Sequence, residues 1–521
     1  MIFFLLITVY LLLFTWFAWK NFRWAIGFFI LTLPVYLIRF KIGNLPSTLL
    51  EAEFVGLFLF WLVKYFKTDY LIIIDFIKKQ RGLFLFIGLF FIASIISIFI
   101  SGIGDSNYWH MTVEALGIWR AFFLEPMLLF VILVGRCHSL VIPTDPAGGG
   151  GVEESLNGQR SERDSSTPLR SAQNDNLTDK DLIMFLILST ISISVVAILQ
   201  KMSPWFYPPQ LWDDVVGDRV TSFFTTPNAI GLYVAPILFL MAAQLLSFRP
   251  RLGGGEISVG GWFSSPLRGG IKCGVSSFTN TLTPALPLKG GGFGQRFLTA
   301  FGMAAALVAI GLSVSQGAWV AFGAGALVAL YLLGKRRTAI ILLLLTMSAG
   351  MYFSSIRTAV LFQDQAGQNR LKLWSYTEKY LSASPQNFIL GTGIRKFFDK
   401  VQKPYYNNKE LEPLLYPHNI FLNFWTETGL LGAVSFTGIV IYLFVMALKI
   451  KKSDKISGIS LIAVLTVFVV QGLVDVPYFK NDLAFVFWIL TLIVIASHQV
   501  AKQSQSNQYS DEIASSLRSS Q

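Results

Sequence analysis

Long apolar runs alternate with short polar segments along most of the chain. A helix of about 20 apolar residues crosses a bilayer, and it satisfies its backbone hydrogen bonds internally, as lipid requires. The pattern therefore predicts an all-α polytopic membrane protein with about 12–13 transmembrane helices. The candidate runs lie at residues 2–19, 24–40, 47–66, 83–101, 115–135, 181–201, 227–248, 297–314, 317–334, 338–356, 418–448, 456–475 and 482–499.

Lysine and arginine residues are concentrated in three connections between these runs, at 64–81, 335–337 and 449–455. Because cytoplasmic loops are enriched in these residues, the three connections are predicted to be cytoplasmic. Arg39 and Lys41 do not fit this alternation. The connections predicted to lie outside are residues 202–226, 357–417 and 476–481.

The composition is that of a membrane protein, and the charge indicates which partners to expect. Charged residues make up 14% of the chain, against about 25% in soluble domains. The net charge of +12 follows from the topology, so we expect contact with membrane lipids and no nucleic acid. The two cysteines, Cys137 and Cys273, follow no disulfide or metal-site spacing.

Two segments rich in Gly, Ser and Pro interrupt the apolar pattern, and we predict that both are low-complexity, disordered cytoplasmic insertions. Their composition cannot form a packed core. The chain then divides into N-terminal transmembrane helices (1–135), the first insertion (136–180), transmembrane helices with an arginine-bearing outer loop (181–248), the second insertion (249–296), transmembrane helices (297–356), the large outer loop (357–417), C-terminal transmembrane helices (418–499) and a tail predicted to be disordered (500–521).

The first candidate site is the outer connection before residue 228. Arg219 precedes Pro227 and Asn228 at the start of the next apolar run. An arginine fork and the unpaired N–H groups of a helix start both bind anions. The alternative is that Arg219 extends to lipid phosphates.

The large outer loop carries the second candidate site. Residues 368–381 have the spacing of an amphipathic helix, with Arg370 near its start and Trp374 on it. Gly391 and Gly393 then form a turn that permits close backbone approach to a ligand, with Arg395 beside it. The excess of cations in this loop opposes the usual charge bias and indicates an anionic substrate.

The third candidate site opens the run at 418–448. His418 and Asn419 lie where the outer loop meets the helix, and Glu427 follows inside the membrane. A histidine titrates near neutral pH and can act as a base, although a lone histidine is more often structural. A carboxylate at membrane depth requires a partner or a function.

Arg120 is the fourth candidate, inside the run at 115–135 with Glu125 five residues later. An intramembrane ion pair that fixes packing and a role in substrate binding explain this pair equally well.

Four segments resemble the O-antigen ligase and O-antigen polymerase superfamily. They are DRVTSFFTTPNAIGLYVAPIL (218–238), LSVSQGAWVAF (312–322), NRLKLWSYTEKYLSASPQNFILGTGIRKF (369–397) and PHNIFLNFWTETGLLG (417–432). The resemblance spans about 180–490 without the second insertion. Gln316 stands where the family usually has a further arginine, so the role of that arginine cannot be carried over to this chain.

The resemblance implies an inverting, metal-independent glycosyltransferase with a GT-C-like membrane fold and no cofactor. It would take a glycan from undecaprenyl diphosphate at the outer face of the bacterial inner membrane and transfer it to a lipid or glycan acceptor. By motif, Arg219 and Arg370 would hold the diphosphate and His418 would accept the acceptor's proton. The further substrate-binding candidates are Arg395, Asn228, Asn419, Trp374, Glu427 and Arg120.

Three alternatives remain open from the sequence. A polymerase would extend a lipid-linked glycan instead of ligating it. A metal-dependent enzyme would use outer-loop carboxylates such as Asp105, Asp213, Asp214 and Asp218, which show no ligand spacing and for which we predict no metal. A permease or flippase for a lipid-linked glycan would typically show repeated halves, and none is visible.

Overall fold

The computed structural model describes residues 2–42, 45–104, 106–137, 177–206, 219–247, 293–405 and 413–519. The two predicted insertions, 136–180 and 249–296, lie outside the described residues except at their ends. The helices are α1 (Ile2–Lys20), α2 (Phe22–Leu31), α3 (Leu49–Lys64), α4 (Phe66–Lys79), α5 (Arg81–Gly102), α6 (Tyr108–Trp119), α7 (Glu125–Arg136), α10 (Asp179–Met202), α11 (Asn228–Ser247), α12 (Phe293–Ser313), α13 (Gln316–Leu332), α14 (Arg336–Tyr352), α15 (Ser354–Val360), α16 (Gln365–Ser382), α17 (Pro385–Leu390), α18 (Ile420–Ser453), α19 (Lys455–Gly472) and α20 (Asn481–Ser519).

Shorter elements connect these helices. The only strands among the described residues, β1 (Arg39–Ile42) and β2 (Leu45–Thr48), pair antiparallel with Arg39 opposite Thr48. The remaining elements are the 3₁₀-helices η1 (Leu33–Leu37), η4 (Pro204–Phe206) and η7 (Lys403–Tyr405) and the π-helices η2 (Arg120–Leu124) and η6 (Phe397–Gln402).

The predicted all-α polytopic class is confirmed, but with fewer long helices than predicted. Within the described ranges, eight helices are long and apolar enough to cross a membrane, or nine if α14 and the bent segment after it form one span. The run at 24–40 is broken, because Pro34 lacks an N–H group and the chain passes from α2 through η1 into β1. The run at 47–66 forms the 16-residue helix α3, which carries two buried glutamates, Glu51 and Glu53.

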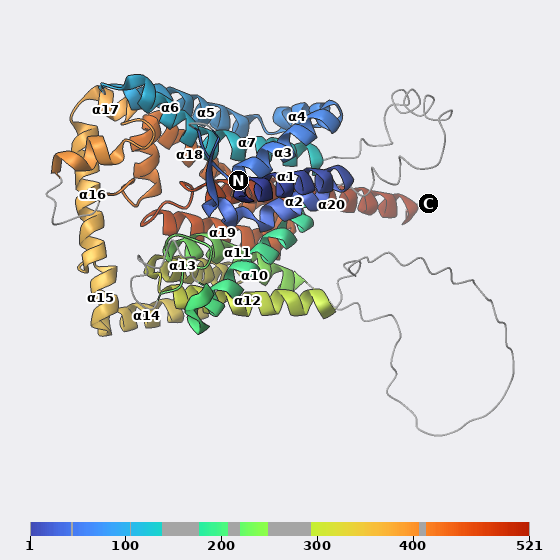
Figure 1. Cartoon of the computed structure of the whole chain (residues 1–521). Coiled ribbons are helices and arrows are strands. Elements are labelled where there is room, and N and C mark those ends of the chain that lie inside the picture. Colours follow the sequence, from blue (N-terminus) through green and yellow to red (C-terminus); the bar gives the residue numbers. More distant parts are fainter. Residues whose placement is uncertain are drawn as a thin grey trace, which may run out of the picture.

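α19 and α20 run through the middle of the helix bundle, with α5, α7 and α18 above them and α10 to α13 below in Figure 1. α20 packs on α7, α10 and α18, and α19 packs on α11, α13 and α18. Of the membrane span of α20, 83% is buried inside the protein. The loop that joins α19 to α20 therefore emerges at the centre of one end of the bundle.

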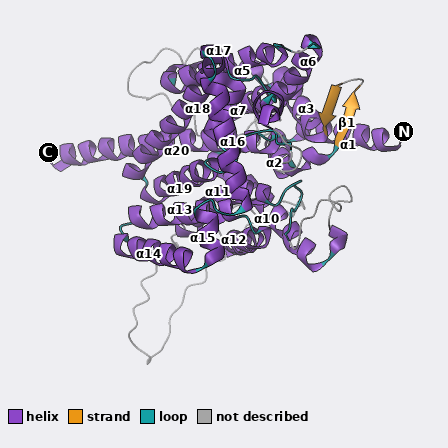
Figure 2. Ribbon diagram, turned by 90° about the vertical axis from the view of Figure 1, so that its left-hand side faces the viewer, coloured by secondary structure: helices purple, strands orange, loops and turns teal. Residues whose placement is uncertain are grey.

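The described residues of the segment 357–417, predicted to be the large outer loop, are mostly helical. α15 and α16 stand across the ends of the bundle helices at the left of Figure 1, and α16 crosses the face turned to the viewer in Figure 2. The predicted amphipathic helix at 368–381 is confirmed within α16, whose buried face includes Leu373, Thr377 and Leu381. Leu373 forms a small separate core with Phe397 and Val401.

The tail predicted to be disordered is helical over its described residues, because α20 continues to Ser519. Helix propagation from an existing helix avoids the cost of nucleation. The tail also contains the good helix formers Lys, Gln, Ala and Leu, so its polar composition alone was misleading.

Glycines join the outer helices to the membrane helices at very short backbone distances. Gly391, Gly393 and Gly429 have positive φ angles of 71°, 88° and 72°. A Cβ atom on Gly391 would lie 2.3 Å from the Thr426 carbonyl oxygen, and one on Gly393 would lie 2.4 Å from the Ser101 nitrogen. Gly391 and Gly393 therefore permit close approach to the backbones of α18 and α5, and their approach to a ligand stays a prediction.

A pair of alanine variants tests this contact. Gly334 also has a positive φ, of 92°, but no atom within 4 Å of its added Cβ, so Gly334→Ala should cost only the left-handed backbone strain of about 1 kcal/mol. Gly391→Ala adds a clash with the Thr426 carbonyl and should lower the melting temperature considerably more. Thermal unfolding in detergent, followed by tryptophan fluorescence, measures both. Equal destabilisation would contradict the proposed backbone contact.

Candidate functional site

The Arg219 side chain is fixed at the start of α11. Its Nε donates a hydrogen bond to the Ser313 carbonyl oxygen at 2.9 Å, and its Nη2 donates to Asn228 Oδ1 at 2.9 Å. Burial lowers the pKa of the Arg219 guanidinium. Arg219 thus lies between the end of α12 and the start of α11, next to Asn228.

Gln200, near the end of α10, holds the backbone that follows Arg219. Its Oε1 accepts hydrogen bonds from the N–H groups of Thr221 and Ser222, and its Nε2 donates to the Ser222 carbonyl. Ser222 adopts a positive φ of 54°, a strained conformation that persists only where its surroundings fix it. The hydrogen bonds of the buried Gln200 amide therefore stabilise the strained backbone beside Arg219.

Arg370 and Trp374 project from the first turns of α16 toward the membrane helices. Arg370 Nε donates a hydrogen bond to the Val474 carbonyl at 3.0 Å. Trp374 Nε1 donates to the Pro417 carbonyl, directly before His418, at 2.9 Å. One amphipathic helix therefore places an arginine over the α19–α20 loop and fixes the segment that carries the histidine.

His418 faces a carboxylate that the sequence analysis did not single out. Its Nδ1 lies 3.5 Å from Asp475 Oδ1, and the residue adopts a positive φ of 52°. Burial alone would raise the pKa of Asp475, but His418, Lys480 and the Val476 amide outweigh it and hold that pKa below its usual range. Asp475 is therefore an ionised acceptor beside one imidazole nitrogen, and the opposite nitrogen, Nε2, is the one suited to take a proton.

Asn419 caps α18. Its Oδ1 accepts from the N–H groups of Phe421 and Leu422, and its Nδ2 donates to the Leu473 carbonyl at 3.1 Å. The N-cap role accounts for asparagine at this position. Asn419 thus fixes the helix start that positions His418.

The α19–α20 loop, residues 473–480, connects these groups. Leu473, Val474 and Asp475 contact Asn419, Arg370 and His418 respectively, as described above. At the other end of the loop, Lys480 Nζ lies 3.3 Å from Thr226 Oγ1, in the connection that carries Arg219. A Cβ on Gly317, four residues after Ser313, would lie 3.2 Å from a Val474 methyl group. Arg370 and His418 therefore contact this loop directly, and the segments that carry and hold Arg219 contact it at Lys480 and Val474.

Arg395 and Glu427 lie beside each other at the glycine turn. The Arg395 side chain is exposed, and its backbone N–H forms a hydrogen bond with the Glu427 carboxylate. Glu427 is buried in α18, close to the glycine turn. The partner of Glu427 in the structure is thus the turn that carries Arg395.

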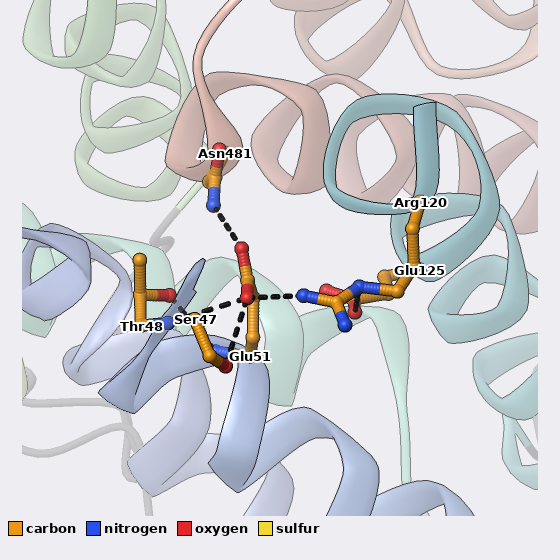
Figure 3. Close-up of polar contacts among 6 residues, drawn as sticks. All are labelled: Ser47, Thr48, Glu51, Arg120, Glu125 and Asn481. Atoms are coloured by element: carbon orange, nitrogen blue, oxygen red, sulfur yellow. Dashed lines mark hydrogen bonds and ion pairs between the residues drawn. The ribbon is translucent and has the colours of Figure 1, made fainter. Parts of the chain in front are cut away.

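Arg120 is held by two glutamates. Its Nη2 donates to Glu51 Oε2, and its Nε lies 3.0 Å from Glu125 Oε1. Figure 3 shows Glu51 between this guanidinium and the side chains of Ser47 and Asn481. The contacts of Arg120 in the structure are therefore those of an intramembrane ion pair.

Residues 301–437 match the model of the protein family described as O-Antigen ligase. This segment belongs to the O-antigen ligase family. It contains α13 to α17, most of α12 and the first half of α18, and with them Arg370, Trp374, Arg395, His418, Asn419 and Glu427. Arg219, Asn228 and Arg120 lie before the matched segment, and Asp475 lies after it. No curated protein matches the chain.

The O-antigen ligase segment alone does not complete the site. Asp475 and Gln200, which sequence reasoning missed, lie outside it and contact residues distant in sequence. Gln200 is a polar residue at the end of an apolar run, and Asp475 is an acid where an outer connection begins. A polar residue at the membrane boundary can be noticed in the sequence, but only the fold shows which residue it contacts.

Among the described residues, no group of three or more His, Cys, Asp or Glu side chains could hold a metal ion. The aspartates considered for a metal-dependent enzyme, Asp105, Asp213, Asp214 and Asp218, all lie outside the described ranges.

The lowered pKa of Asp475 predicts a pH-dependent stability. An aspartate with a native pKa below its unfolded value of about 3.9 stabilises the fold above that value, and the stabilisation is lost as pH falls through the native pKa. Asp475→Asn should therefore lower the free energy of unfolding at pH 7 by about 1–3 kcal/mol, and by less at pH 3. Thermal unfolding of both proteins at the two pH values measures this.

Asp75→Asn is the matched control, because Asp75 pairs with Lys79 on an exposed helix face. An exposed pair contributes at most about 1 kcal/mol. If the Asp475→Asn deficit were equally large at pH 7 and pH 3, the ionised state of Asp475 would not be the source of its contribution.

Proposed function

We propose that this chain is a membrane glycosyltransferase of the O-antigen ligase type. It transfers a glycan from undecaprenyl diphosphate to a lipid A core or another surface acceptor, at the outer face of the bacterial inner membrane. The observation that carries the proposal is that Arg370 and the His418–Asp475 pair meet at the α19–α20 loop, which also contacts the connection that carries Arg219, in a chain with an O-antigen ligase segment.

The two arginines suit the leaving group. When the bond between the anomeric carbon and the diphosphate oxygen breaks, the electron pair and the negative charge go to undecaprenyl diphosphate. Guanidinium groups bind phosphate through two parallel hydrogen bonds and stay charged. Arg219 and Arg370 each use Nε to bind a backbone carbonyl, which fixes the planes of their guanidinium groups before substrate arrives.

His418 suits the acceptor. The acceptor hydroxyl oxygen attacks the anomeric carbon and gives its proton to the imidazole, so that one displacement inverts the anomeric configuration. Asp475 beside Nδ1 stabilises the resulting imidazolium and orients the ring. The reaction as written balances with these three side chains and no metal ion.

A polymerase would use the same donor chemistry, so the site residues alone do not separate it from a ligase. We favour the ligase because the family that matches residues 301–437 is described by that activity. Mass analysis of surface glycan from a deletion strain separates the two, since loss of all attached glycan indicates a ligase and a single attached repeat unit indicates a polymerase.

Substitution of the three side chains tests the mechanism. With purified protein, lipid-linked glycan and acceptor, Arg219→Ala, Arg370→Ala and His418→Ala should each reduce release of undecaprenyl diphosphate by about 10²-fold or more, as loss of a preorganised charge or donor does. Lysine at either arginine position should restore little activity, because a point charge lacks the planar fork.

Arg357→Ala is the matched control, since Arg357 is an exposed arginine on the same outer segment; it should retain the parent rate. Activity should also survive EDTA. Transfer by Arg370→Ala at the parent rate would show that the diphosphate binds elsewhere. A parent protein that moves lipid-linked glycan across a bilayer without releasing undecaprenyl diphosphate would be a transporter.

A further inference from the structure

A π-turn interrupts the membrane span formed by α6 and α7. In η2 the N–H of Glu125 donates to the carbonyl of Arg120, five residues earlier. Pro126 explains the interruption, because it has no N–H to donate to the Phe122 carbonyl four residues before it, and its ring would clash with that carbonyl in a regular helix. Such turns are rare and are often found at functional sites.

The π-turn changes which side chains share a face. In a regular α-helix, residues five apart point about 140° away from each other. The wider turn brings Arg120 and Glu125 together, with 3.0 Å between Nε and Oε1. Arg120 then reaches Glu51, and Glu51 Oε1 accepts a hydrogen bond from Asn481 Nδ2 at 3.0 Å (Figure 3). Asn481 is the first residue of α20, directly after the α19–α20 loop.

The π-turn also exposes a carbonyl to the same loop. The Phe122 oxygen, which Pro126 cannot satisfy, accepts a hydrogen bond from Tyr478 Oη at 2.9 Å. Tyr478 is fully buried, and Trp488 Nε1 donates to the same hydroxyl at 3.3 Å. A buried carbonyl without a donor costs about 1–3 kcal/mol, so this bond favours one position of the loop.

Both contacts lie close to the groups that orient the site. Tyr478 follows Asp475 by three residues, and Asn481 follows it by six. The segment from Asp475 to Asn481 is short and mostly buried, so its backbone has little freedom to move independently of Tyr478 and Asn481. Displacing Tyr478 would move Asp475 away from His418.

We propose that the π-turn Arg120–Leu124 is a positioning element for the site, and that Tyr478 and Asn481 are its positioning residues. They fix the α19–α20 loop so that Asp475 faces His418 and the Val474 carbonyl faces Arg370. Neither residue touches substrate. The proposal rests on the proposed function for its kinetic test, and has a second test that does not depend on activity.

The kinetic test removes one hydroxyl group. Tyr478→Phe keeps the buried ring and should lower kcat for glycan transfer about 10-fold, with KM for the lipid-linked donor nearly unchanged. Tyr442→Phe is the matched control, because Tyr442 Oη binds Gln80 Oε1 at 2.8 Å between helices away from the α19–α20 loop; it should stay within twofold of the parent.

A double variant separates positioning from general destabilisation. If Tyr478 acts through Asp475, then Tyr478→Phe should cost less than twofold in an Asp475→Asn background, because interacting residues are not additive. An equal loss in both backgrounds, or a Tyr478→Phe rate within twofold of the parent, would overturn the proposal. Should Tyr478→Phe insert poorly, Asn481→Ala removes the other contact and takes the same test.

Hydrogen exchange provides the test without turnover. Tyr478→Phe should increase deuterium uptake in residues 473–480 of the full chain in detergent, whereas Tyr442→Phe should leave it unchanged. Unchanged uptake in Tyr478→Phe contradicts the positioning role. If the loop loosens as expected but the parent protein transfers no glycan, the proposed function fails and the structural role of the π-turn stands.

Discussion

Polar contacts with the α19–α20 loop are the interactions that hold Arg370, His418 and Asn419 in place. The loop offers two backbone carbonyls and one carboxylate, and an asparagine, an arginine and a histidine from two other segments use them. A donor or acceptor that loses its partner costs free energy. The position of this short loop therefore determines the positions of Arg370 and His418, whereas Arg219 is held by Ser313 and Asn228.

The bundle around the loop explains why its position is well defined. The loop joins the two central helices α19 and α20, so it cannot move without moving elements packed on several sides. The outer helices are fitted to the bundle separately, through glycines that bring backbones together where a side chain would clash. Arg370 and His418 thus come from two different segments, and they contact neighbouring residues of the same loop, Val474 and Asp475.

Much of the fold and part of the site could be predicted from the sequence. Apolar run length locates the helices, because crossing lipid requires it, and Arg219, Arg370 and His418 stand out as polar groups where outer connections meet helices. Their acceptors could not be predicted, since Ser313 and Val474 contribute only carbonyls, which every residue has. Asp475 and Glu51 carry visible signals, but their partners are far away in sequence. The break after α2 had a local signal in Pro34 that run length alone ignores.

The proposed function requires that α16 lie on the outer side of the membrane, and a labelling experiment tests this most directly. Cysteine at the exposed position Ser375 of α16, in a chain with Cys273 replaced by serine, should react with a membrane-impermeant maleimide in intact cells whose outer membrane is permeabilised. Cysteine at Ser453, at the end of α18 in a connection predicted to be cytoplasmic, should react only after the inner membrane is opened. Labelling of position 375 only after the inner membrane is opened would contradict the account.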